Sequence, residues 1–193
     1  MTRLTRVCRA VGVGIAVATA TLVMTQVAHA QLPPPKIQPN QAAIQAPPAN
    51  IPFLIGKVST GFQIYKCTAS KWTFDHPEAT LVTGGQEIAH DAGPTWTAVT
   101  DKSAVKGARK AGVPSPTPGA IDWLLLSATP ADGAPKGLLT DTTFIQRVNT
   151  TGGITPTRAC AEGEFERVPY TADYYFYKAA GKSDPPVTPG KPA

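Results

Sequence analysis

Two histidines downstream of residue 30, His76 and His90, are the side chains with the widest range of accessible chemistry. A metal centre would bring both imidazoles to one ion, with Asp75, Glu78 or Asp91 completing the ligand shell. The spacing does not require such a centre, and no H-E-x-x-H motif occurs. His90 ordering a loop by hydrogen bonding, with His76 on a surface turn, accounts for the same residues. We therefore predict no metal site and no cofactor.

Nucleophilic catalysis has less support, because the chain lacks a G-x-S-x-G elbow. A dyad of His90 with a distant serine stays open as an alternative. Paired carboxylates for glycoside cleavage are recognised by their separation in space, so the sequence alone selects no pair. The carboxylates available for such a pair include Asp122, Asp141, Glu164, Glu166 and Asp173. We predict no catalytic residue.

Aromatic residues crowd the end of the chain, where four of the five tyrosines lie between residues 170 and 177. In a strand, Tyr175 and Tyr177 point to one face, whereas Tyr174 and Phe176 point to the other. One face should be core. The other suits a groove for sugars or peptides, with cross-strand aromatic packing as the alternative.

Arg147 is the charged candidate, and it shares a strand face with Asn149. Asp173 is its expected ion-pair partner if the two late strands are neighbours, and anion binding is the second interpretation. The basic run over residues 102–110 lacks interleaved aromatics, which is typical of a solvated loop. The candidate ligand-binding residues are therefore His90, Trp96, Arg147, Tyr174, Tyr175 and Tyr177.

The N-terminus has the pattern of a secretory signal peptide over residues 1–30. Its positive region contains Arg3, Arg6 and Arg9. An apolar stretch from Val11 to Val23 follows, and Ala28 and Ala30 form an A-x-A cleavage site. A transmembrane anchor is the weaker alternative, because the apolar run is shorter than the roughly 20 residues needed. We expect a secreted or periplasmic protein with no membrane span after cleavage.

The low charge of the 193-residue chain argues against some classes of function. Only 16% of the residues are charged, against roughly 25% in an ordinary domain. Removing the three arginines of the signal peptide lowers the basic count from 18 to 15 and the net charge from +5 to +2. Such a low charge argues against a nucleic-acid partner.

Cysteine content agrees with export. Cys8 lies inside the signal peptide, which leaves Cys67 and Cys160 in the mature chain. In an oxidising compartment these two most simply form one disulfide, with two separate buried thiols as the alternative. Closing a loop of about ninety residues would contribute roughly 4–5 kcal/mol in the chain-entropy account.

Periodicity predicts an all-β domain over residues 53–180. A Pro/Gln-rich disordered linker over 31–52 and a disordered Pro-rich tail over 181–193 flank it. Short β-branched and aromatic runs are separated by turn residues, with Gly84-Gly85 as a hairpin. The apolar run 120–127 predicts a strand buried on both sides, and only 103–112 tolerates a short helix. The expected fold is an antiparallel β-sandwich or barrel with at most one short helix.

Several local motifs occur in a fixed order along the chain. They are Gly61-Phe62-Gln63-Ile64-Tyr65-Lys66-Cys67, Trp72-Thr73-Phe74, His90-Asp91-Ala92-Gly93-Pro94-Thr95-Trp96, Ile121-Asp122-Trp123-Leu124-Leu125-Leu126, residues 145–153 and residues 168–177. In these motifs the chain resembles an uncharacterised secreted family of bacteria and fungi, domain of unknown function 3455. The resemblance implies export and a β-rich fold, and it brings no established activity.

The best functional hypothesis is an exported, non-enzymatic domain that binds an envelope or extracellular ligand. Its binding face would be built from the late tyrosines, with Trp96 and His90 as neighbours. The alternatives are a small secreted hydrolase or metal-dependent enzyme centred on His90, and a purely structural or stress-related surface protein.

Overall fold

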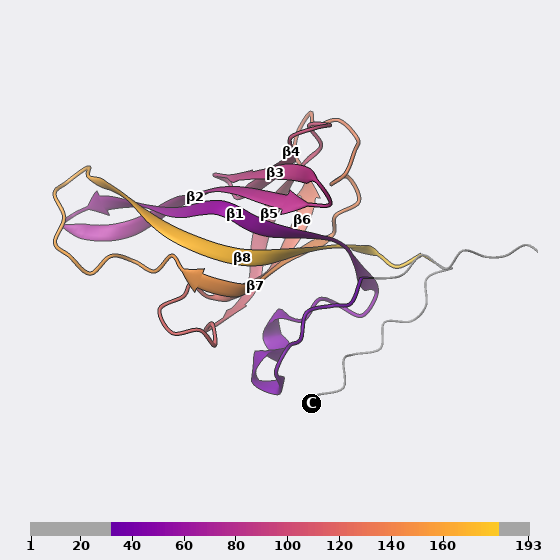
Figure 1. The fold of residues 1–193 in the computed structure, drawn as a ribbon, viewed down its shortest axis with the longest axis horizontal. Coiled ribbons are helices and arrows are strands. Elements are labelled where there is room, and N and C mark those ends of the chain that lie inside the picture. The colour runs from indigo at the N-terminus through magenta and orange to yellow at the C-terminus, as the bar shows by residue number, and fades with distance from the viewer. Residues whose placement is uncertain (1–31, 182–193) are drawn as a thin grey trace, which may run out of the picture. The chain divides into compact units, whose positions relative to one another are not determined.

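The computed structural model describes residues 32–181, which form a closed antiparallel barrel of eight strands in chain order (Figure 1). The elements are η1 (Pro39–Ile44), β1 (Asn50–Thr68), β2 (Lys71–Thr83), β3 (Gln86–Asp91), β4 (Thr95–Ala98), β5 (Ala104–Val113), β6 (Trp123–Pro130), β7 (Phe144–Gly152) and β8 (Phe165–Ala179). This confirms the all-β prediction and selects the barrel over the sandwich. The predicted signal peptide, and the tail from residue 182 onward, lie outside the described residues.

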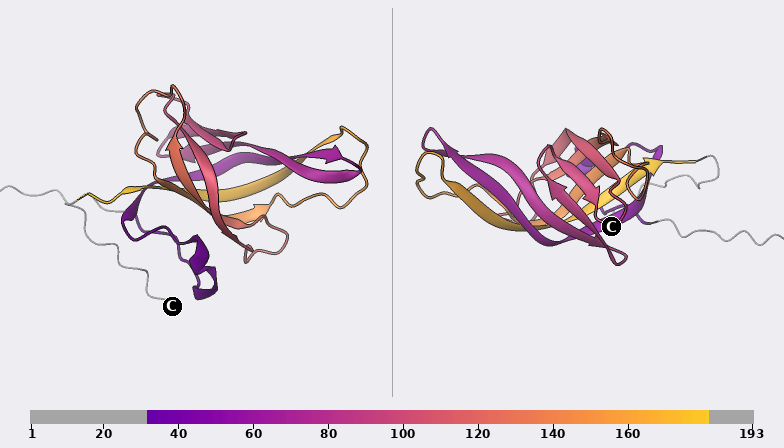
Figure 2. Two further views of the ribbon diagram at one scale, coloured as in Figure 1. Left: turned by 180° about the vertical axis from the view of Figure 1, so that it is seen from behind. Right: turned by 90° about the horizontal axis from the view of Figure 1, so that it is seen from above.

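Three strands continue beyond the barrel wall as a ribbon. Pairing of β2 with β3 reaches only to Ala79, and pairing of β7 with β8 ends at Tyr170. Past these points β2, β1 and β8 pair only with one another, and they project from the barrel in both views of Figure 2. We call residues 61–79 and 165–169 the ribbon.

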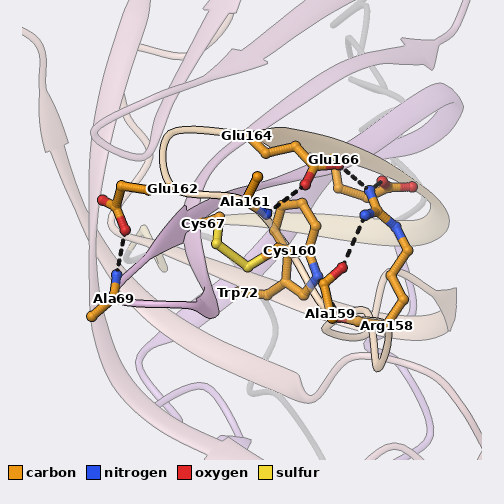
Figure 3. The surroundings of a disulfide bond; sticks show 10 residues. All are labelled: Cys67, Ala69, Trp72, Arg158, Ala159, Cys160, Ala161, Glu162, Glu164 and Glu166. Atoms are coloured by element: carbon orange, nitrogen blue, oxygen red, sulfur yellow. Dashed lines mark hydrogen bonds and ion pairs between the residues drawn. A yellow bond between two sulfur atoms is a disulfide. The ribbon is translucent and has the colours of Figure 1, made fainter.

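The predicted disulfide between Cys67 and Cys160 is confirmed, and it lies at the tip of the ribbon (Figure 3). The Arg158 guanidinium stacks 4.8 Å over the Trp72 ring and forms ion pairs with Glu164 and Glu166. These contacts hold the segment before β8 against the hairpin of β1 and β2. A disulfide is typical of an oxidising, extracytoplasmic compartment.

Apolar side chains that alternate along the strands fill the barrel interior. They include Leu81, Ile88, Trp96, Val105, Leu126, Ile145, Tyr174 and Phe176. Gly107 makes room for the largest of them, because a Cβ there would lie 2.7 Å from the Trp96 ring. The glycine in β5 therefore fixes how Trp96 packs across the barrel.

The outer face of β5, β6 and β7 is covered in part by the chain that precedes β1. Ile44 at the end of η1 is fully buried in a second cluster with Trp123, Leu125 and Val148. The prediction of a disordered linker over 31–52 is therefore wrong for η1 and for Asn50 onward, where β1 begins. The composition of this segment did not predict its ordered packing, because Ile44 is the one large apolar side chain in it that is fully buried before β1 begins.

That cover explains why the apolar run 120–127 is buried on both sides, as predicted. Leu124 and Leu126 pack with the barrel interior, whereas Trp123 and Leu125 pack beneath η1. The strand begins at Trp123 rather than at residue 120.

Two local predictions have opposite outcomes. Gly84 and Gly85 form the tight turn between β2 and β3, with φ of +50° and +82°, so the predicted hairpin is confirmed. The helix allowed over 103–112 is wrong, because this segment is strand β5. Its backbone pairs with β4 on one side and β6 on the other, which outweighs its helix-tolerant composition. Within residues 32–181, no helix is long and apolar enough to cross a membrane.

Candidate functional site

A cavity of about 350 Å³ opens where the ribbon meets the barrel. Its walls come from seven of the eight strands and from the turn between β3 and β4. The lining residues are Gln63, Phe74, Asp75, Pro77, His90, Gly93, Pro94, Trp96, Leu124, Leu126, Arg147 and Tyr174. Four of the six predicted ligand-binding residues are therefore brought together here.

His90 and Trp96 occupy paired positions on the β3–β4 hairpin, so their side chains share one face. Their rings stack at a centroid distance of 4.2 Å and an interplanar angle of 8°. Tyr174 from β8 contacts both rings edge-on, at 5.2 Å and 5.7 Å. A hairpin and a strand nearly eighty residues further along the chain thus form one aromatic wall.

Burial determines the protonation state of His90. The side chain is 3% exposed, and its desolvation lowers its pKa to about 3, with a smaller contribution from the Arg147 charge. In the neutral ring, Nδ1–H donates to the Thr95 carbonyl oxygen at 2.8 Å. Nε2 therefore carries the lone pair, and no group within the described residues donates a hydrogen bond to it.

Gln63 contributes a buried amide to the cavity. The residue is 3% exposed, and its Nε2 has no hydrogen-bond partner. Within residues 32–181 only three buried side-chain polar atoms lack a partner, and two of them belong to cavity-lining residues: Gln63 Nε2 and Trp96 Nε1. Buried polar groups in folded proteins are nearly always paired, so this concentration at one cavity distinguishes the site.

Arg147 of β7 is half-buried at the cavity. Its Nε and Nη2 donate to the Asp122 carbonyl oxygen at 3.1 Å and 2.9 Å. The predicted ion pair with Asp173 is wrong, because Asp173 instead binds Lys57 and Asn149, each at 2.9 Å. The register of β7 and β8 shifts after Val148, and Asn149 has a φ of +52°. The regular alternation of side chains is therefore interrupted at Asn149, and its side chain binds Asp173 while that of Arg147 lines the cavity.

The other two candidate tyrosines lie away from the cavity. Tyr175 packs against the outer cluster around Ile44. The Tyr177 hydroxyl donates to Gln146 Oε1 at 2.5 Å in the same outer layer. The alternation predicted for β8 is therefore correct, and it is the inward face that supplies the cavity.

His76 is not among the cavity-lining residues and forms a cluster with Asp75 and Glu78. Its Nδ1 is 2.5 Å from Asp75 Oδ2, and this hydrogen bond raises the pKa of His76. The described part of the chain contains no group of three or more His, Cys, Asp or Glu side chains placed to hold a metal ion.

Sequence reasoning missed the wall that the ribbon provides, namely Gln63, Phe74 and Pro77, and it considered Asp75 only as a possible metal ligand. One signal was available for Gln63, which shares one face of β1 with the buried Tyr65 and Cys67. A polar residue on an otherwise buried strand face indicates either a satisfied core amide or a binding group.

Comparison with known proteins adds one finding. Residues 83–178 match the family model described as Protein of unknown function (DUF3455), and this range includes His90, Trp96, Arg147 and Tyr174. The motifs at 61–67 and 72–74, which supply the ribbon wall, precede the matched range. Neither the curated proteins nor the solved structures gave a significant match. The chain thus carries, over residues 83–178, a domain of the family Protein of unknown function (DUF3455).

Proposed function

We propose that this protein is an exported binding domain that holds a small organic ligand in the cavity beside His90 and Trp96. One observation carries the proposal: two residues that line the cavity, Gln63 and Trp96, each have a buried polar atom without a protein partner. Such atoms cost free energy when nothing pairs with them. A ligand in the cavity would supply partners and offset that cost.

The shape and lining of the cavity favour a small ligand. Binding sites for small molecules are concave, mostly apolar and about 300–1,000 Å³ in volume, with a few convergent polar groups. This cavity has that character, because Leu124, Leu126 and Phe74 supply apolar surface around the polar groups.

Binding is favoured over catalysis by the state of His90. A general base works best when its pKa lies near the operating pH. The pKa of His90 is lowered to about 3, so its neutral Nε2 serves better as a hydrogen-bond acceptor than as a base. The disulfide and the signal-peptide pattern of residues 1–30 support export to the periplasm or medium, where the ligand would be met.

Binding of the neutral fluorescent probe N-phenyl-1-naphthylamine tests the proposal. The probe should bind the wild-type protein saturably, at one site per chain. Leu124→Trp should abolish binding by filling the cavity, whereas Val99→Trp, at a 43% exposed residue outside the cavity, should bind like the wild type.

Phe74→Ala provides a second variant in case Leu124→Trp fails to fold. The Phe74 side chain is 49% exposed, so its removal should weaken probe binding several-fold while the fold is retained. Absence of saturable binding to the folded wild type would overturn the proposal, as would wild-type binding by folded Leu124→Trp.

A further inference from the structure

We infer that the ligand is an organic acid whose carboxylate binds Arg147 and whose apolar, one- or two-ring body fills the cavity. This inference rests on the proposed function, since it specifies the chemistry of a ligand in the same cavity. Arg147 is the one cation among the cavity-lining residues.

Arg147 has unused donors. A guanidinium carries five N–H groups in a rigid fork that fits a carboxylate. The structure uses one N–H of Nε and one of Nη2, and both donate to the same backbone carbonyl of Asp122. No side chain within residues 32–181 forms an ion pair with Arg147, although the residue is half-buried.

The carboxylates around Arg147 are each occupied elsewhere. Asp122 lies 3.7 Å from Arg109, and Asp173 binds Lys57. Asp75, the one carboxylate among the cavity-lining residues, is held by His76. A half-buried cation is costly unless a counter-charge meets it, so an anionic ligand group is the complement that the protein itself omits.

The remaining walls define the body of the ligand. Leu124 and Leu126 line the barrel side, and Phe74 lies on the ribbon opposite Tyr65, with Pro77 further along the same strand. A volume of about 350 Å³ is near the small end of ligand sites, which suits a compact ring system rather than a long chain. The Gln63 amide offers a second donor to the acid or to a ring substituent.

A matched pair of ligands tests the inference: 2-naphthoate and its uncharged isostere 2-naphthamide, measured by calorimetry at pH 7. We expect the wild type to bind the acid at least tenfold more tightly than the amide. Arg147→Gln should reduce this preference to twofold or less, and Arg147→Lys should recover part of it. Arg109→Gln, which removes an exposed arginine outside the cavity, should keep the wild-type preference.

The neutral probe separates the two proposals. Equal affinities for the acid and the amide in a wild type that still binds N-phenyl-1-naphthylamine would overturn the organic-acid inference alone. Failure of all three compounds to bind the folded wild type would overturn the proposed function with it. An Arg147→Gln variant that binds the neutral probe normally but has lost the acid preference would support the inference, because its cavity is intact.

Discussion

Two buried glutamines lie on either side of the barrel wall and differ in the hydrogen bonds of their side-chain amides. Gln146, in the outer layer, is 1% exposed and has both ends of its amide paired: Oε1 accepts from Tyr177 and Nε2 donates to the Ile44 carbonyl. Gln63, at the cavity, is 3% exposed and its Nε2 has no partner. The same side chain thus completes a packed layer in one place and is left incomplete in the other.

The difference separates polar groups that hold the fold from polar groups available to a ligand. The Gln146 amide ties β7 and β8 to the segment that precedes β1, across about a hundred residues of chain. The Gln63 side chain lies beside the Tyr170 hydroxyl, but its Nε2 makes no hydrogen bond of normal geometry within the described residues. Nε2 of His90 in the same cavity likewise accepts no hydrogen bond from them. Substitutions should therefore affect stability on the outer side and ligand binding on the cavity side.

The largest expected effect concerns the ribbon that carries Gln63. Replacing Cys67 and Cys160 by Ala removes a bridge across 93 residues, which should cost about 4–5 kcal/mol of unfolding free energy. Urea unfolding measures this loss, and hydrogen exchange should show that ribbon amides lose more protection than amides of β7. A loss below about 1 kcal/mol would show that the ribbon does not depend on the bridge.

Gln146→Leu should cost about 2–4 kcal/mol, because it leaves the Tyr177 hydroxyl and the Ile44 carbonyl without partners. Combining it with Tyr177→Phe should recover part of the loss, since both members of one hydrogen bond are then removed. Denaturant unfolding of the single and double variants provides the measurement. If Gln146→Leu alone were as stable as the wild type, Gln146 would not hold the fold and would not differ from Gln63 in this respect.

Acid should destabilise the cavity side through His90. The folded pKa of about 3 lies below the unfolded value of 6.5, so stability is fully present above pH 6.5 and declines as pH falls toward 3. Between pH 6.5 and 5.0 the loss should be about 1.5–2 kcal/mol. His90→Gln should lack this component while retaining those of His76 and the carboxylates, so the two pH profiles measured by urea unfolding should diverge. Parallel profiles would contradict a buried, neutral His90.

Gln63→Leu should have the smallest effect on stability, within about 1 kcal/mol of the wild type, because no hydrogen bond of its Nε2 is lost. Its affinity for 2-naphthoate should fall several-fold, since a donor to the ligand is removed. Thermal unfolding and calorimetry on the same preparation check both parts. A destabilisation as large as that of Gln146→Leu would place Gln63 among the residues that hold the fold.

Local patterns in the sequence predicted much of the fold. Alternation along β8 separated Tyr174 and Phe176 from Tyr175 and Tyr177, and the two late cysteines predicted the bridge. These features depend on neighbouring residues or on simple elimination. The packing of η1 was not predictable in this way. Its few apolar residues show no periodic pattern of their own, and they are buried only because β6 presents Trp123 and Leu125 on its outer face.

The composition of the site was less accessible for the same reason. His90, Trp96, Arg147 and Tyr174 could be proposed as chemically suitable residues, but barrel closure between β1 and β8 decides which of them meet. Closure also brings in Gln63 and the ribbon wall. The predicted ion pair of Arg147 with Asp173 is absent for a local reason. The register of β7 and β8 is irregular at Asn149, and Asp173 accepts a hydrogen bond from the Asn149 side chain instead.

The most direct measurement is a crystal structure of the protein grown with 2-naphthoate at saturating concentration. The expected result is one molecule in the cavity, with its carboxylate within hydrogen-bond distance of Arg147, its rings against Leu124 and Phe74, and the Gln146 network unchanged. A saturated crystal in which the cavity holds no naphthoate, or in which the acid binds only elsewhere on the surface, would contradict a ligand site at Gln63 and His90.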